Sequence, residues 1–270
     1  MRSIAIMNQK GGVGKTTTAV NLSAALAANG QRVCLVDLDP QAHASLHFGV
    51  EPTPDDLSVY HVLTGKTAIG EVTREVAENL WLLPSSLDVA AAEIELVSVI
   101  GREVILRDKL RGNPPAIDYL FIDCPPSLGI LTLNALAAVN EVFIPLQPHY
   151  FALHGLSKLL ETIDLVAARL NDQLRLSGVV LCMYDAGTRL ALEVGQDVDE
   201  FFRNARGQEN PWSNAKAFQT RIRRNVRLAE APSFGKSIFQ YAPDSNGAED
   251  YRLLAEEVAN VNAETIRLAS

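Results

Sequence analysis

A glycine-rich segment that ends in Lys-Thr-Thr constrains the fold more than any other feature of this chain. It runs from Gln9 to Thr17 (QKGGVGKTT), between an apolar run at residues 3–7 and a helical pattern at residues 15–29. Glycines let backbone N–H groups turn inward around phosphate oxygens, and the following helix points its positive N-terminal end at them. In such a loop Lys15 neutralises the β- and γ-phosphates and the Thr16 hydroxyl ligates Mg²⁺. The usual pattern has glycine where this chain has Gln9, so the segment is a variant phosphate-binding loop.

The rest of the chain alternates short apolar runs with helical stretches. We expect further strands at residues 32–38, 80–83, 119–123, 142–146 and 176–183, and helices at residues 87–111, 131–138 and 153–170. This alternation predicts an α/β fold of the P-loop type, a mostly parallel twisted sheet with helices on both faces. Neither a repeat nor a linker divides the sequence. We therefore predict a single domain over residues 1–270, with a possible inserted loop at 203–214.

Aspartates stand at the ends of two more of the predicted strands. Asp37 and Asp39 stand at the end of the second strand, and Asp123 ends the strand at 119–123. Ligands of open α/β sheets bind outside the carboxyl ends of the strands, which is also where the glycine loop lies. Three strand ends thus carry groups that could together bind one Mg·ATP. Phosphoryl transfer depends mainly on positioning the phosphates and the nucleophile and on neutralising the phosphate charge, which these groups can do. The sequence predicts an ATPase.

Composition excludes several other classes of protein. Hydrophobic residues make up 47% of the chain, too many for a disordered protein, and no apolar run is long enough to span a membrane. The first residues lack the order of a secretory leader, so we expect a cytoplasmic protein. Cys34, Cys124 and Cys182 are far apart, which predicts buried free thiols rather than a disulfide or metal site.

The loop resembles the deviant Walker A box of the ParA/MinD family of ATPases. The shared feature is KGGVGKTT, with a lysine at the second position of the loop. The resemblance implies that this lysine, Lys10, reaches across an ATP-dependent sandwich homodimer to the partner's phosphates. The sequence DLDPQ at residues 37–41 resembles the family's first switch. By that match Asp39 orients or activates the attacking water and Asp37 supports the metal site.

Further segments extend the resemblance over nearly the whole chain. Residues 119–127 resemble the Walker B strand and second switch, which implies that Asp123 holds Mg²⁺, and LTLNAL at residues 131–136 implies that Asn134 contacts the γ-phosphate region. Residues 225–233 (NVRLAEAPS) are similar to a segment of chromosomal, Soj-type ParA proteins. Met183 and Pro243 are implied at the adenine. The nucleotide contacts implied at the loop are Gly11, Gly12, Val13, Gly14, Lys15, Thr16 and Thr17.

Basic residues gather late in a chain whose net charge is −8. Only Glu209 opposes them between residues 203 and 227. Such a cluster indicates salt-sensitive contacts with the DNA backbone that carry no sequence information. Together with the resemblance, it predicts non-specific DNA binding and association with the nucleoid. The candidate DNA-binding residues are Arg203, Arg206, Lys216, Arg221, Arg223, Arg224 and Arg227.

The resemblance leaves alternatives for what the ATPase does. The leading one is a partition or positioning ATPase whose hydrolysis is stimulated by a ParB-like protein or a cargo adaptor. A MinD-like switch without DNA binding is the second, but a membrane switch needs a basic amphipathic C-terminal helix, and residues 249–268 are mainly acidic. A relative of the nitrogenase iron protein is the third, and it would need cluster cysteines beside Cys124. Because the first strand begins at residue 3, we expect no N-terminal helix-turn-helix domain, and because the C-terminal stretch is acidic we expect no membrane partner.

Overall fold

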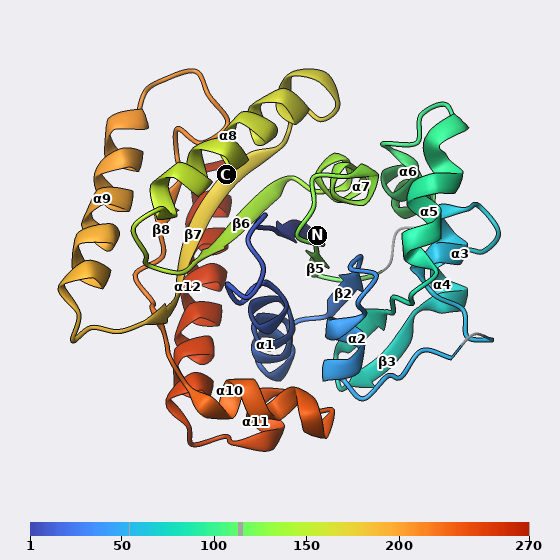
Figure 1. Cartoon of the computed structure of the whole chain (residues 1–270), viewed down its shortest axis with the longest axis horizontal. Coiled ribbons are helices and arrows are strands. Elements are labelled where there is room, and N and C mark those ends of the chain that lie inside the picture. The colour runs from blue at the N-terminus through green and yellow to red at the C-terminus, as the bar shows by residue number, and fades with distance from the viewer. Residues whose placement is uncertain (54, 113–115, 270) are drawn as a thin grey trace.

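A mostly parallel, nine-stranded sheet forms the centre of the molecule (Figure 1). The computed structural model describes residues 1–53, 55–112 and 116–269, with side chains as far as residue 260. The strand order is β3-β4-β2-β5-β1-β6-β7-β8, with β9 also beside β7, and β3 pairs antiparallel with β4. The strands are β1 (Arg2–Ile6), β2 (Val33–Asp37), β3 (Arg74–Ala77), β4 (Leu80–Leu83), β5 (Tyr119–Asp123), β6 (Glu141–Leu146), β7 (Arg175–Tyr184), β8 (Lys216–Ala217) and β9 (Ile222–Arg223).

Helices cover both faces of this sheet, so its central strands are buried on both sides. Ile4 and Ile6 of β1 belong to the hydrophobic cluster under α1 and α12, whereas Ala5 belongs to the cluster under α7 and α8. The helices are α1 (Lys15–Ala28), α2 (His43–His47), α3 (Val59–Leu63), α4 (Ile69–Val72), α5 (Val89–Glu95), α6 (Ile105–Gly112), α7 (Ile130–Ala138), α8 (Ala152–Arg169), α9 (Arg189–Ala205), α10 (Val226–Glu230), α11 (Ile238–Tyr241) and α12 (Asn246–Ala269), with 3₁₀ turns η1 (Leu96–Ser98) and η2 (Ala231–Phe234).

The predicted fold class is confirmed, and the register explains where a ligand can bind. Asp123 of β5 lies beside both Asp37 of β2 and Ile6 of β1. The last residues of three neighbouring parallel strands therefore meet at one edge of the sheet. The glycine loop follows Ile6 directly, so the aspartates and the loop share this edge.

The single helix predicted at residues 87–111 is wrong. The structure has α5, the turn η1 and α6, with the break centred on Gly101. Gly101 has φ 74°, in the left-handed region that ends a helix, and Val97 and Val99 are β-branched residues that disfavour one. Apolar residues on both sides of the break gave the sequence its helical periodicity.

The predicted loop at residues 203–214 begins later than expected. Helix α9 continues to Ala205, so Arg203 is helical and the loop starts at Arg206. The loop is tied to the sheet because Leu176 N donates to Pro211 O at 2.9 Å. Trp212 is half-buried against the core, so its indole packs within the molecule.

Candidate nucleotide-binding site

The loop between β1 and α1 has the backbone shape of a phosphate cradle. Gly12 and Gly14 have φ values of 72° and 94°, which side chains with a Cβ rarely adopt. Gly14 also precedes the first residue of α1, so the N-terminal amides of a 14-residue helix open onto the loop. Gly11 is exposed, and Val13 is buried and anchors the loop to the core. The loop can therefore surround an anion with N–H groups.

Two lysines of the loop lie in different surroundings. Lys15 is 7% exposed and its Nζ donates to Lys10 O at 3.2 Å, which folds the ammonium over the loop. Burial lowers the pKa of Lys15, while Asp123 and Asp39 oppose that shift. The side chain of Lys10 is exposed. Lys15 thus faces the interior of the cradle, and Lys10 is available to another molecule.

Asp123 is the clearest electrostatic signal of the site. Both oxygens of its carboxylate are buried without a hydrogen-bond partner among the described residues. Burial and the neighbouring Asp37 carboxylate raise the pKa of Asp123 well above its usual range, and Thr16 and Lys15 partly oppose the rise. A buried carboxylate with no partner is costly unless a cation or a donor joins it.

Asp37 organises the loop that follows β2. Its carboxylate accepts from Asp39 N at 3.2 Å and from both Ser45 N and Ser45 Oγ, at 2.9 and 2.8 Å. Burial raises the pKa of Asp37 to about 7. Asp37 therefore supports the position of Asp39 through the backbone, and Ser45 is a functional residue that sequence reasoning missed.

The carboxylate of Asp39 accepts a hydrogen bond from the loop that follows it. It is 8% exposed, and its Oδ1 accepts from Gln41 N at 2.9 Å. Shortly after it, Ala42 adopts φ 52°, a strained conformation for a residue with a Cβ. Backbone strain of this kind concentrates at switch and active-site segments.

These residues fit Mg²⁺ and a nucleotide triphosphate. Asp123 and Thr16 would supply oxygen ligands of the kind that Mg²⁺ prefers, and the N–H groups of residues 11–17 with Lys15 would hold the phosphates. Bound Mg²⁺ neutralises the charge that develops on the phosphate oxygens. By the predicted assignment Asp39 would orient a water at this edge, and Asp37 accepts a hydrogen bond from Asp39 N that supports its position.

Asn134 is bonded to backbone groups within the chain, and its predicted role at the γ-phosphate stays a prediction. Its side chain is fully buried and donates to Arg102 O at 2.7 Å and to Ile130 O at 3.0 Å. It also accepts from Leu106 N at 3.0 Å. The amide is thus satisfied by backbone groups, and it fastens the segment before α6 to α7.

The predicted adenine contacts are Met183 and Pro243. Met183 is half-buried near the end of β7 and has φ 51°, while Cys182 beside it contacts the Gly14 position. Pro243 is exposed just before α12, and its carbonyl accepts from Arg252. Met183 is thereby next to the phosphate loop, and the Pro243 assignment stays a prediction.

The candidate DNA-binding residues divide into two groups. Arg223 is paired with Glu249 and Asp250 at 2.6 Å, Arg227 with Glu230 at 2.8 Å, and Arg221 lies 3.9 Å from Asp199. The other four are exposed and form no ion pair within the described part of the chain: Arg203, Arg206, Lys216 and Arg224. These four carry charge that a polyanion can use.

Sequence reasoning also missed the residues that brace the phosphate loop. Asn8 accepts from Lys10 N at 3.0 Å and donates to Pro145 O at 2.7 Å, which joins the loop to β6. The hydroxyls of Thr18 and Tyr251 lie 3.1 Å apart and join α1 to α12. Asn8 directly precedes the motif and could have been suspected from that position, whereas Tyr251 carries no local signal.

Comparison with known proteins supports this assignment. Residues 1–176 match the family model described as an AAA domain. The chain is 49% identical over 257 residues to the sporulation initiation inhibitor protein Soj of Bacillus subtilis, covering 95% of this chain and 97% of that one. It is 45% identical to the chromosome-partitioning ATPase Soj of Treponema pallidum, covering 95% and 96%.

Solved structures agree with the sequence comparison. The cobyrinic acid a,c-diamide synthase of Mycobacterium smegmatis, crystallised with an ATP analogue and magnesium, superposes with a TM-score of 0.79 at 36% identity, covering 95% of this chain and 93% of that one. The cell division ATPase MinD of Pyrococcus furiosus superposes with a TM-score of 0.76 at 26% identity, covering 96% and 99%. With its variant phosphate loop and its aspartates at the adjoining strand ends, the chain belongs to the ParA/MinD family of P-loop ATPases, which act on ATP with Mg²⁺.

Proposed function

We propose that this protein is a partition or positioning ATPase that dimerises around ATP, binds DNA non-specifically as a dimer, and is released when a ParB-like protein or cargo adaptor stimulates hydrolysis. The observation that carries the proposal is a phosphate loop with one buried lysine, Lys15, and one exposed lysine, Lys10. Near-half identity to Soj over almost the whole chain supports the partition role. The protein would then work in the cytoplasm on the nucleoid.

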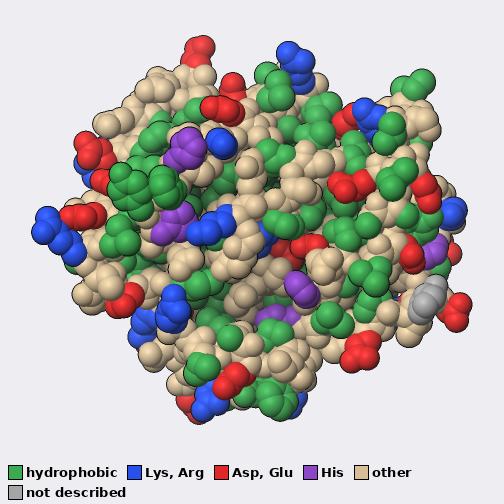
Figure 2. Space-filling view, in the orientation of Figure 1, with side chains coloured by type: hydrophobic (Ala, Val, Ile, Leu, Met, Phe, Trp, Pro, Cys, Tyr) green, Lys and Arg blue, Asp and Glu red, His purple; other side chains and the backbone are tan. Residues whose placement is uncertain are grey.

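Exposed apolar side chains support the dimer. Tyr150 and Phe151, just before α8, are 84% and 66% exposed. Ile94 of α5 and Ile100 beyond it are 78% and 99% exposed. Figure 2 shows hydrophobic side chains gathered at several places on the viewed face. Large apolar groups left in water favour association with a second surface. A dimer face there would also bring Lys10 towards the partner.

Surface charge supports binding to the DNA backbone only in part of the molecule. On the face in Figure 2, basic side chains are interspersed with acidic ones rather than gathered into one patch. The unpaired group, Arg203, Arg206, Lys216 and Arg224, lies between residues 203 and 224. Because two copies double this charge, dimerisation would raise DNA affinity steeply at a given salt concentration.

The MinD-like alternative has less support. None of the helices in the described residues is long and apolar enough to cross a membrane. The acidic stretch at residues 249–268 belongs to α12, and the structure describes its side chains as far as residue 260. Within residues 246–260, α12 carries four acidic side chains: Glu249, Asp250, Glu256 and Glu257. Such a helix suits an anionic membrane surface poorly.

Binding to random-sequence duplex DNA tests the proposal. We expect binding with ATP, and little with ADP or without nucleotide, at near-physiological salt. The variant Arg206→Ala/Arg224→Ala should weaken binding and flatten its salt dependence by about two phosphate contacts. The matched control Lys66→Ala/Arg111→Ala removes the same charge near α3 and α6 and should bind normally. No binding of the wild type in any nucleotide state would contradict the proposal and favour the switch without DNA.

A further inference from the structure

A single buried carboxylate, that of Asp37, holds both ends of the loop that carries Asp39. The loop covers residues 38–42 and leads from β2 to α2. At its beginning, Oδ1 of Asp37 accepts from Asp39 N at 3.2 Å. Beyond its end, Oδ2 of Asp37 accepts from Ser45 N at 2.9 Å and from Ser45 Oγ at 2.8 Å. Since Asp37 is 0% exposed, the position of the loop depends on how this carboxylate is turned.

The hydroxyl of Ser45 fixes the orientation of that carboxylate. Its Oγ donates to Asp37 and also accepts from Ser85 N at 3.0 Å. A hydroxyl has one proton, and a backbone N–H can only donate. Because Ser85 N takes an acceptor position on Oγ, the proton of Ser45 is directed at Asp37. Oδ2 of Asp37 is thus held by Ser45, and Oδ1 is left to accept from Asp39 N.

The bond from Ser85 connects the loop of Asp39 to a second strand. Ser85 is fully buried and lies just beyond β4, which pairs parallel with β2 so that Val36 is beside Leu83. The hydroxyl of Ser45 therefore joins the carboxyl ends of two neighbouring strands. Functional groups held by the strands of a scaffold are positioned more precisely than groups held by a loop alone.

Backbone strain in the same loop shows that it is held from outside. Ala42 has φ 52°, and its N–H donates to Asp39 O at 2.8 Å. A residue with a Cβ keeps such a conformation only where the surrounding contacts over-determine it. The bonds of Asp37 lie on both sides of Ala42 along the chain. Without the hydroxyl of Ser45, Ala42 could relax and Asp39 would move with it.

We propose that Ser45 is a positioning residue for ATP hydrolysis, because its hydroxyl orients Asp37 and thereby fixes the loop that presents Asp39. Neither the nucleotide motifs nor the family resemblance gives Ser45 a role. This role concerns the hydrolysis step, so it lies beyond the proposed function in partition. It takes the predicted action of Asp39 on a water as its premise.

The variant Ser45→Ala removes the hydroxyl and keeps the backbone N–H that donates to Asp37. We expect turnover to fall about tenfold to a hundredfold, the usual effect of losing a side chain that orients a group of the site. The affinity for ATP should stay within about threefold, because the phosphate loop is unchanged. Single-turnover hydrolysis and binding of a fluorescent ATP analogue separate the two quantities.

The matched control is Ser58→Ala. The hydroxyl of Ser58 is also buried, but it lies 2.9 Å from Ser86 Oγ and belongs to the N-terminus of α3. Removing it costs a comparable hydrogen bond without touching Asp37. Turnover in Ser58→Ala should therefore remain close to that of the wild type. An equal loss of turnover in Ser45→Ala and Ser58→Ala would overturn the proposal.

A double-mutant cycle with Asp37→Ala tests whether Ser45 acts through Asp37. In that background Ser45→Ala should lower turnover no further, because residues that act as a unit are not additive. A hydroxyl that only supports packing would lower turnover by the same factor in both backgrounds. Such additivity would overturn the role of Ser45 as a positioning residue.

Amide hydrogen exchange of the nucleotide-free protein, followed by mass spectrometry, measures the loop itself. Peptides covering residues 38–47 should exchange at least about tenfold faster in Ser45→Ala, the change expected when a hydrogen bond to a charged group is lost. They should exchange normally in Ser58→Ala. Wild-type exchange or wild-type turnover in Ser45→Ala would overturn the proposal. Since neither measurement contains DNA, a failure of the proposed DNA binding would leave this result standing.

Discussion

At the scale of single residues, the site contains buried charged side chains that a bound nucleotide and cation would neutralise. Asp123 has no hydrogen-bond partner for either oxygen in the described structure, and Lys15 is buried although it carries a charge. Both features are unfavourable in isolation and become favourable around Mg·ATP. Among the described residues, the carboxylate of the adjoining Asp39 accepts one hydrogen bond, from Gln41 N, and its action on a water is a prediction.

Asp39→Ala should keep ATP binding and lower hydrolysis about a hundredfold or more, the usual effect of losing a water-activating group. Single-turnover hydrolysis and binding of a fluorescent ATP analogue measure the two separately. Asp39→Asn is the matched control for loop structure, because its amide oxygen can still accept from Gln41 N. Full turnover in either variant would show that another group activates the water.

At the scale of elements, close packing between strands limits what the sheet accepts. A Cβ at Gly178 of β7 would clash with the ring of Phe218. That ring is 2% exposed and packs edge-on against Phe143, with centroids 4.9 Å apart, so it has little room to move. The absence of a side chain at Gly178 is therefore a packing requirement.

Gly178→Ala should lower the free energy of unfolding by about 1–3 kcal/mol through overpacking. Urea denaturation followed by circular dichroism measures the change. Gly155→Ala is the control, since Gly155 is exposed in α8 and a Cβ there would have no other atom within 4 Å. That substitution should stabilise the helix slightly. Equal stability of Gly178→Ala and the wild type would show that Phe218 can move aside.

The buried imidazole of His47, in α2, predicts that the folded protein loses stability in acid. His47 is 2% exposed, its Nε2 is buried without a partner among described residues, and burial lowers its pKa to about 4. The imidazole of His47 is protonated below about pH 6.5 in the unfolded chain, but only near pH 4 in the folded chain. The stability due to neutral His47 is therefore present above pH 6.5 and is lost as the pH falls to about 4.

This loss should amount to about 3 kcal/mol over that range. Urea denaturation between pH 7 and pH 4 measures it in the wild type and in His47→Gln, which cannot take up the proton. His154→Gln, at an exposed position of α8, should follow the wild type. A pH dependence of His47→Gln identical to that of the wild type would rule out His47 as the cause.

Local patterns predicted the parts of the fold that depend on neighbouring residues. The strand at 119–123 and the turn conformations of Gly12 and Gly14 follow from apolar runs and from the backbone freedom of glycine. The roles of Asn134 and Ser45 could not be predicted, because their partners lie far along the chain or in backbone groups. The pairing of Arg223 with Asp250 likewise depends on the docking of α12, which a local charge count does not include.

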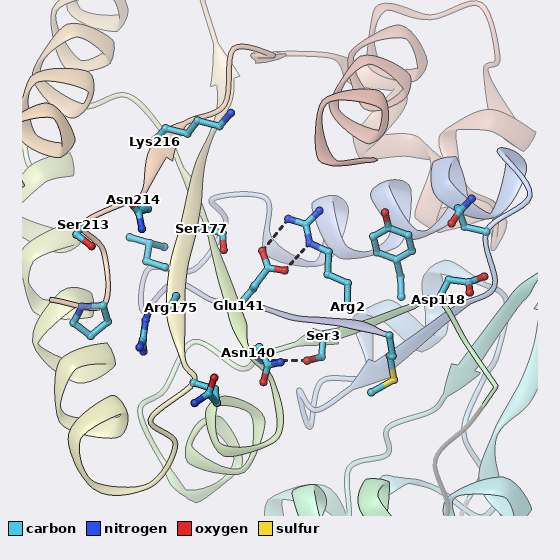
Figure 3. Close-up of a pocket in the computed structure, with 16 residues that line it drawn as sticks. Arg2, Ser3, Asp118, Asn140, Glu141, Arg175, Ser177, Ser213, Asn214 and Lys216 are labelled. Atoms are coloured by element: carbon cyan, nitrogen blue, oxygen red, sulfur yellow. Dashed lines mark hydrogen bonds and ion pairs between the residues drawn. The ribbon is translucent and has the colours of Figure 1, made fainter. Parts of the chain in front are cut away.

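At the scale of the whole molecule, the sheet separates two polar regions. Its carboxyl edge carries the phosphate loop and the aspartates, and its amino edge carries a groove of about 710 Å³ whose lining includes the ion pair between Arg2 and Glu141 (Figure 3). The two edges lie at opposite ends of the same strands, so the groove is separate from the nucleotide site.

The most direct test of the account is the mass of the protein in solution with Mg·ATP and with Mg·ADP, measured by light scattering on the slowly hydrolysing Asp39→Ala variant. We expect a dimer with ATP and a monomer with ADP, and we expect Lys10→Ala in the same background to remain monomeric while it still binds ATP. Lys66→Ala removes an exposed lysine elsewhere and should dimerise normally. A monomer in both nucleotides, or an ATP dimer that forms without Lys10, would contradict the account.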